Sequence, residues 1–177
     1  MSLSVSAPGR PVLVSQLPLP DRLVVWAVRA WVIGLKRRID AAAPIQAAFG
    51  KHGIPEAACL IDALMSVVAC GALRPLVVEC VCHETISEDE RVLLAAAALH
   101  QNGCGFEACF LLRTMLSPGA SRGAGEILER LGALLADAGL TLFRWQPRTE
   151  RYVLGPAPRS EYDRDEHEPP TRRPTLH

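Results

Sequence analysis

Apolar residues recur along most of the chain with the three- and four-residue spacing of an amphipathic α-helix. This spacing predicts helices at residues 21–38, 40–50, 55–69, 87–100, 106–116 and 121–138. Proline, glycine or acidic residues mark most of the predicted ends, and Ser87 with Glu90 forms a capping-box pattern at the fourth start. The sequence therefore predicts a mainly α protein, a single-domain bundle of five to six helices.

The predicted helix at 21–38 is apolar around most of its circumference, which is typical of an element at the centre of a core. Its basic residues Arg22, Arg29 and Lys36 recur every seven residues and so share one stripe. The apolar run 23–35 is shorter than the roughly 20 residues that span a bilayer. The alternative to core packing is an interfacial membrane helix that places its two tryptophans at the lipid surface.

A small β element is predicted beside the helices. Residues 76–82 are short, rich in valine and preceded by Pro75, a pattern typical of a strand. Two further short strands within 140–154 could form a hairpin that joins it, and residues 12–14 could add an edge strand. On a strand at 76–82, Cys80 and Cys82 would point to one face and would be poorly placed for a disulfide with each other.

Composition divides the chain into three parts. Residues 1–20 are low in charge and contain several prolines, which indicates a loosely ordered N-terminal arm. The helical domain covers residues 21–154, and residues 155–177 form a charged, proline-rich tail that we expect to be disordered. A length of 177 residues is consistent with one folded domain that needs no covalent staples.

The charge and the cysteine content argue against two classes of protein, nucleic-acid binders and disulfide-bonded secreted proteins. The formal net charge is zero, which argues against a nucleic-acid binder. We interpret the six cysteines as free thiols, because the start of the chain has no secretory signal pattern and a chain of this size needs no disulfide framework. The sequence therefore predicts a cytoplasmic protein without a transmembrane segment. Its many alanines and arginines are typical of a GC-rich bacterial gene.

The centre of the chain carries the candidate chemistry. Cys80, Cys82, His100 and Cys104, with His83 as a substitute, could supply the four ligands of a zinc or iron site. The alternative is structural, with the cysteines as small buried hydrophobes and the histidines as capping or solvent-facing residues. A third interpretation, a reactive thiol, is weaker because a strand would hold the His83 ring away from the Cys82 sulfur.

The glycine-rich stretch at residues 118–125 precedes a predicted helix and is typical of an interhelical loop. An anion site there is disfavoured because the phosphate-loop pattern and its preceding strand are absent from the sequence. The spacing of the serine, histidine and carboxylate residues does not predict a catalytic site.

The function that we predict from these observations is a non-enzymatic protein-interaction or regulatory module, with a homo-oligomer as one form of it. The alternative is a transition-metal protein that binds zinc or iron through the central Cys/His cluster. An enzyme whose site the sequence does not reveal is the third hypothesis.

Overall fold

Six α-helices account for most of residues 11–143, the part of the chain that the computed structural model describes. A short 3-10 helix, η1 (Val14–Gln16), precedes them. The helices are α1 (Leu19–Arg37), α2 (Ala42–Gly50), α3 (Ala57–Gly71), α4 (Glu88–Gln101), α5 (Gly105–Leu112) and α6 (Pro118–Asp137). The mainly α bundle predicted from the hydrophobic spacing is confirmed, and most helix ends lie within three residues of the predicted positions.

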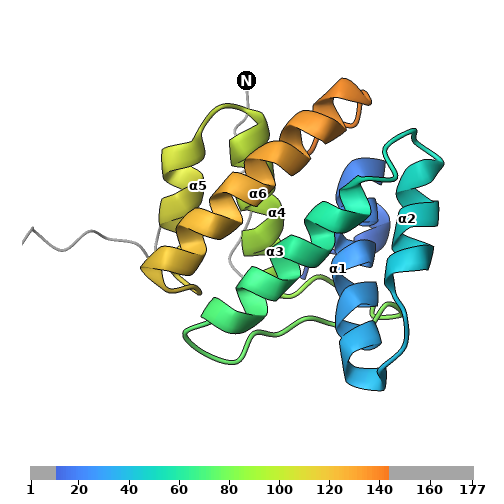
Figure 1. Cartoon of the computed structure of the whole chain (residues 1–177), viewed down its shortest axis with the longest axis horizontal. Coiled ribbons are helices and arrows are strands. Elements are labelled where there is room, and N and C mark those ends of the chain that lie inside the picture. Colours follow the sequence, from blue (N-terminus) through green and yellow to red (C-terminus); the bar gives the residue numbers. More distant parts are fainter. Residues whose placement is uncertain (1–10, 144–177) are drawn as a thin grey trace, which may run out of the picture. The chain divides into compact units, whose positions relative to one another are not determined.

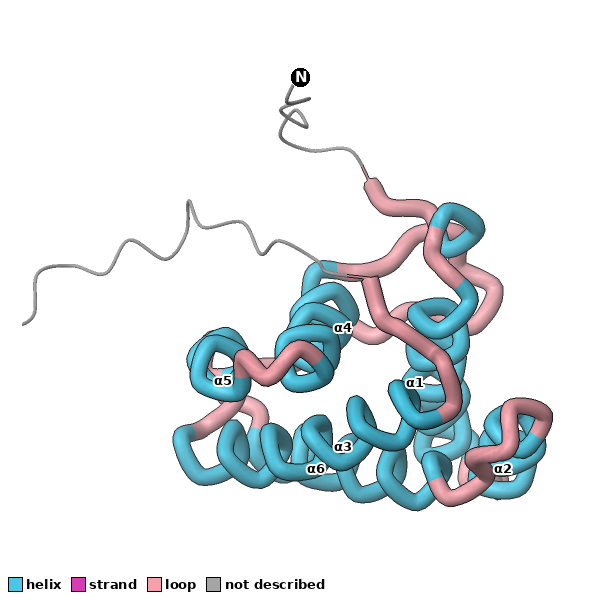
Figure 2. The backbone as a smooth tube through the Cα atoms, turned by 90° about the horizontal axis from the view of Figure 1, so that it is seen from above, coloured by secondary structure: helices cyan, strands magenta, loops and turns pink. Residues whose placement is uncertain are grey.

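The helices pack around α3 and α6, which run side by side (Figure 1). Seen from above, α1 and α4 lie on one side of this pair (Figure 2). Helix α6 also contacts α5, and α2 packs on α1 and α3. The side chains that fill the space between them are mostly aliphatic, among them Val28, Ile61, Leu94, Leu112 and Leu131.

Helix α1 packs against α2, α3 and α4, and its core-facing side is apolar as predicted. Val24, Val25, Ala27 and Val28 are buried against neighbouring helices. Arg29 lies on the same stripe as the exposed Arg22, but Arg29 is only 1% exposed. In residues 11–143, no helix has both the length and the apolar character needed to cross a membrane.

The glycine-rich stretch at 118–125 is not the predicted loop, because it forms the first two turns of α6. Pro118 occupies the first turn, and the Ser117 hydroxyl caps the helix by accepting from the Ala120 N–H group. The small residues let α6 approach its neighbours. A Cβ atom on Gly71 of α3 would lie only 2.0 Å from the Ala120 Cβ atom.

The predicted strand at 76–82 is wrong. This segment is extended and irregular, and pairing within residues 11–143 is limited to two isolated antiparallel bridges, Leu13–Thr85 and Ala72–Leu116. The physical reason is that side chains of α1 and α4 take up the backbone polar groups of this segment, so it needs no neighbouring strand. Residues 140–143 are also irregular, and the rest of the predicted hairpin lies outside the described residues.

Part of the predicted arm packs against the domain. The Val14 N–H group donates to the Glu84 carbonyl (2.7 Å), and the Ile86 N–H group donates to the Val12 carbonyl (3.0 Å). The edge-strand prediction at 12–14 therefore corresponds to a single bridge against residues 84–86. Residues 1–10 and the predicted tail at 155–177 lie outside the described part of the chain.

The close approach of α3 and α6 gives the first testable prediction. We expect Gly71→Ala to lower the free energy of unfolding by about 1–3 kcal/mol, because its Cβ atom overlaps Ala120. Gly123→Ala on α6 is the matched control. Its Cβ atom would meet nothing closer than 3.8 Å, so the better helix former should stabilise the fold by about 0.5–1 kcal/mol. Urea denaturation of both variants measures the difference, and equal effects would contradict the packing.

Candidate functional site

A buried ion pair joins α1 to the first turn of α4. The Arg29 Nε atom donates to Glu90 Oε1 at 2.7 Å, and its Nη2 atom donates to Oε2 at 2.9 Å. The two side chains are 2% and 1% exposed. The remaining guanidinium N–H groups donate to the backbone carbonyls of Cys80, His83 and Thr85. All five donors of the guanidinium are therefore used, which is the condition under which a buried arginine is tolerated.

Glu90 has two structural roles at once. The Ser87 N–H group donates to its carboxylate at 2.8 Å, while the Ser87 hydroxyl accepts from the Glu90 N–H group. This is the capping box predicted from the sequence, and it is confirmed. The Glu79 N–H group also donates to Glu90, at 3.2 Å. The same carboxylate thus starts α4, neutralises Arg29 and fixes the preceding segment.

Asp89, the neighbour of Glu90 in the first turn, fixes the earlier half of that segment. Its carboxylate accepts from both Arg74 Nη atoms and from the Val77 N–H group, the latter at 2.7 Å. Burial alone would raise the pKa of Asp89, but the hydrogen bonds from Arg74 and Val77 and the Arg74 charge outweigh it and lower the pKa.

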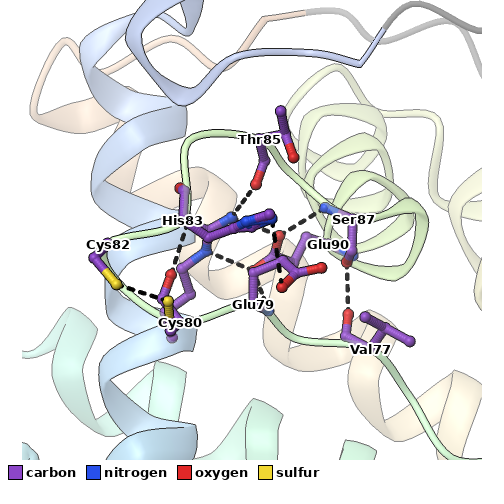
Figure 3. Close-up of polar contacts among 9 residues, drawn as sticks. Val77, Glu79, Cys80, Cys82, His83, Thr85, Ser87 and Glu90 are labelled. Atoms are coloured by element: carbon purple, nitrogen blue, oxygen red, sulfur yellow. Dashed lines mark hydrogen bonds and ion pairs between the residues drawn. The ribbon is translucent and has the colours of Figure 1, made fainter.

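A tight turn brings the Cys80 and Cys82 thiols together. The His83 N–H group donates to the Cys80 carbonyl at 3.0 Å, which closes a turn with Val81 and Cys82 at its centre. The two sulfur atoms are 2.8 Å apart, and both residues are exposed (Figure 3). The prediction that Cys80 and Cys82 lie on one face of a strand, poorly placed for a disulfide with each other, is therefore wrong.

The two thiols influence each other's ionisation. The hydrogen bond from the Cys82 thiol lowers the pKa of Cys80, since it stabilises the Cys80 thiolate. The same hydrogen bond and the charge of the Cys80 thiolate raise the pKa of Cys82. Beside them, His83 Nε2 lies 3.8 Å from a Glu79 carboxylate oxygen.

The structure does not bring the predicted metal ligands together. Cys80 and Cys82 lie beside Glu90, at the start of α4, whereas His100 lies ten residues further along that helix, about 15 Å away along its axis. The Cys104 sulfur contacts the Asn102 carbonyl just after α4 ends. Within residues 11–143, no three or more histidine, cysteine, aspartate or glutamate side chains form a group that could hold a metal ion.

His100 instead packs between helices. A Cβ atom on Gly125 of α6 would lie 3.3 Å from His100 Nε2 and 2.9 Å from the Cys109 sulfur. Within the described part of the chain, His100 Nε2 is buried without a hydrogen-bond partner. Desolvation lowers the pKa of His100, and the Glu129 charge opposes this in part, so the imidazole is neutral at physiological pH.

The three cysteines outside the candidate site lie in apolar stretches of predicted helices, which predicts that they pack as small hydrophobes. Cys109 is partly buried, in agreement, but Cys59 and Cys70 on α3 are exposed.

The Arg29–Glu90 pair was not predicted from the sequence. Two sequence features could have indicated this pair. Arg29 is the one charged residue within the apolar run 23–35, and the capping-box role of Glu90 uses only one of its two carboxylate oxygens.

A second feature, the α1 groove, lies at the C-terminal half of α1. It consists of two hollows of about 330 and 360 Å³ that share Trp31 and Leu35. One opens toward α3 and the segment 74–78, and the other toward α2. The Trp31 Nε1 atom donates to Asp62 at 2.7 Å, which fixes the indole, whereas Leu35 is 61% exposed.

Comparisons with protein-family models, with curated proteins and with solved structures found no match to this chain.

The buried pair gives a stability prediction. We expect Arg29→Met to lower the free energy of unfolding by about 3–5 kcal/mol, since it leaves the Glu90 carboxylate buried without its counter-charge. Arg29→Met combined with Glu90→Met should cost less than the sum of the two single changes, because neither charge is then left unpaired. Arg22→Met, at an exposed position seven residues earlier on α1, is the control and should change stability by less than about 0.5 kcal/mol. Equal effects at Arg29 and Arg22 in urea denaturation would argue against the pair.

Asp89 gives a prediction for pH. Because its pKa is lower in the folded protein, its contribution to stability is present above the unfolded-state pKa of about 3.9 and is lost as the pH falls toward the lowered folded value. The melting temperature of the wild type should therefore exceed that of Asp89→Asn at neutral pH, and the difference should shrink below about pH 4. A difference that stays constant as the pH falls below about 4 would contradict the assignment.

Proposed function

We propose that the protein is a protein-interaction module that binds an amphipathic segment of another protein in the α1 groove. The observation that carries the proposal is the groove itself, where a fixed tryptophan and an exposed leucine separate two hollows at the C-terminal end of α1. A cytoplasmic location is part of the proposal, since a reducing compartment keeps all six cysteines as thiols.

The shape of the groove supports an elongated apolar ligand. Each hollow is at the lower end of the range for binding pockets, so neither alone suits a large small molecule. Two hollows on either side of Leu35 instead match side chains that project from one face of a helix at successive turns. Ile39, at 58% exposed, and Leu35 extend the apolar surface at the second hollow. Trp31 supplies the type of anchor that dominates protein interfaces.

The charges around the groove are mixed. In the first hollow, Lys36 is exposed and Asp89 is paired with Arg74, so the lining is net positive.

The second hollow has the opposite sign. It is lined by Arg38 with Asp40 and Asp62, whose hydrogen-bond donors are the neutral Ala42 and Trp31 N–H groups, so both carboxylates keep their charge. The groove therefore favours a segment that carries acidic and basic side chains beside its apolar face.

Selection of random helical peptides displayed on phage against the full chain tests the proposal. We expect enriched peptides to combine apolar residues at three- and four-residue spacing with acidic and basic residues, and Leu35→Glu to weaken their binding at least about tenfold. Phe106→Glu on α5 is the matched control: Phe106 is also exposed (83%) but does not line the groove, so its replacement should leave binding unchanged. Enrichment of peptides that lack this apolar spacing, or equal binding to both variants, would overturn the proposal.

A further inference from the structure

The turn at residues 80–83 places two solvent-facing thiols in direct contact. The Cys80 and Cys82 sulfurs are 2.8 Å apart, and Figure 3 shows both side chains on the outer side of the loop, pointing toward each other. Neither residue is buried. The other exposed cysteines, Cys59 and Cys70, stand eleven residues apart on α3, about 16 Å along the helix, so they cannot contact each other.

The sulfur–sulfur distance favours a covalent bond over a shared metal ion. Two thiolates bound to one tetrahedral zinc ion lie about 3.8 Å apart, given Zn–S bonds of about 2.3 Å. The Cys80 and Cys82 sulfurs are already closer than that. They need to approach by only about 0.8 Å to reach disulfide bond length.

The backbone beneath the thiols holds this arrangement. The Cys80 carbonyl accepts from Arg29 Nη1 at 3.1 Å, and the His83 carbonyl accepts from the same atom at 2.8 Å. The two ends of the turn are therefore fixed to a buried side chain that is itself paired with Glu90. Cys80 and Cys82 are preorganised for a reaction with each other, because the turn has little freedom to separate them.

We propose that Cys80 and Cys82 form a reactive dithiol site that exchanges with small-molecule disulfides of the glutathione class. One thiolate of the pair attacks a sulfur of the substrate disulfide, whose S–S bond breaks and releases one thiolate, which takes a proton from water. The second protein thiolate then attacks the mixed disulfide and displaces the other half of the substrate. The two protein thiols are oxidised to one disulfide, and the substrate disulfide is reduced to two thiols.

This site does not depend on the α1 groove, and its test has a separate readout. The full-length reduced protein is incubated with oxidised glutathione, and intact mass and peptide mapping follow each cysteine. We expect the Cys80–Cys82 peptide to lose two hydrogen atoms and to carry no glutathione at completion. Cys59 and Cys70 in the same molecules are the internal control and should each retain one glutathione, since neither has a second thiol in reach.

Single substitutions separate the two steps. Cys80→Ser and Cys82→Ser should each retain one glutathione on the remaining cysteine, because no second thiol can displace it. Both changes are at exposed positions, and circular dichroism checks that the variants are folded. Two glutathiones on the Cys80–Cys82 peptide of the wild type, or no reaction there while Cys59 and Cys70 react, would overturn the proposal.

Discussion

The Arg29–Glu90 ion pair is the constraint on which the segment between α3 and α4 depends. It joins α1 to the first turn of α4, and the guanidinium also donates to three backbone carbonyls of that segment. A segment without regular structure can be ordered only if its polar backbone groups find partners. Here Arg29 supplies partners for three carbonyls, and side chains at the start of α4 supply others, so the segment is held without a sheet.

The carboxylates of Asp89 and Glu90, in the first turn of α4, hold different parts of this segment. Asp89 holds residues 74–77, which form one wall of the α1 groove. Glu90, directly and through Arg29, holds residues 79–85, which present the paired thiols. The two candidate sites therefore lie on one segment that is anchored at one helix end. The sequence predicts these acidic residues only as a helix cap. In the structure they also hold the segment that carries both candidate sites.

The sequence was informative wherever local chemistry decides the structure. Hydrophobic spacing located the six helices, and the Ser87–Glu90 pattern located the start of α4, because caps and amphipathic faces depend on residues a few positions apart. The sequence did not predict the positions of Arg29 and Cys80. Both depend on the contact between residues 29 and 90, which are far apart in the chain and share no local pattern. The valines at 77, 78 and 81 are typical of a strand, but no neighbouring strand is present in residues 11–143 to pair with them. The glycines at 119, 123 and 125 are typical of a loop. In the structure they lie in the first turns of α6, which begins at Pro118 and is capped by Ser117.

Proton exchange at the Arg29 guanidinium tests the central claim most directly. In a nitrogen-edited NMR spectrum of the reduced protein, the Arg29 Nε–H and Nη–H signals should exchange with water far more slowly than those of the exposed Arg22 on the same helix, since all five Arg29 protons are in buried or partly buried hydrogen bonds. Equal exchange rates for the two guanidinium groups would contradict the account, because the segment that carries both candidate sites would then lack its anchor.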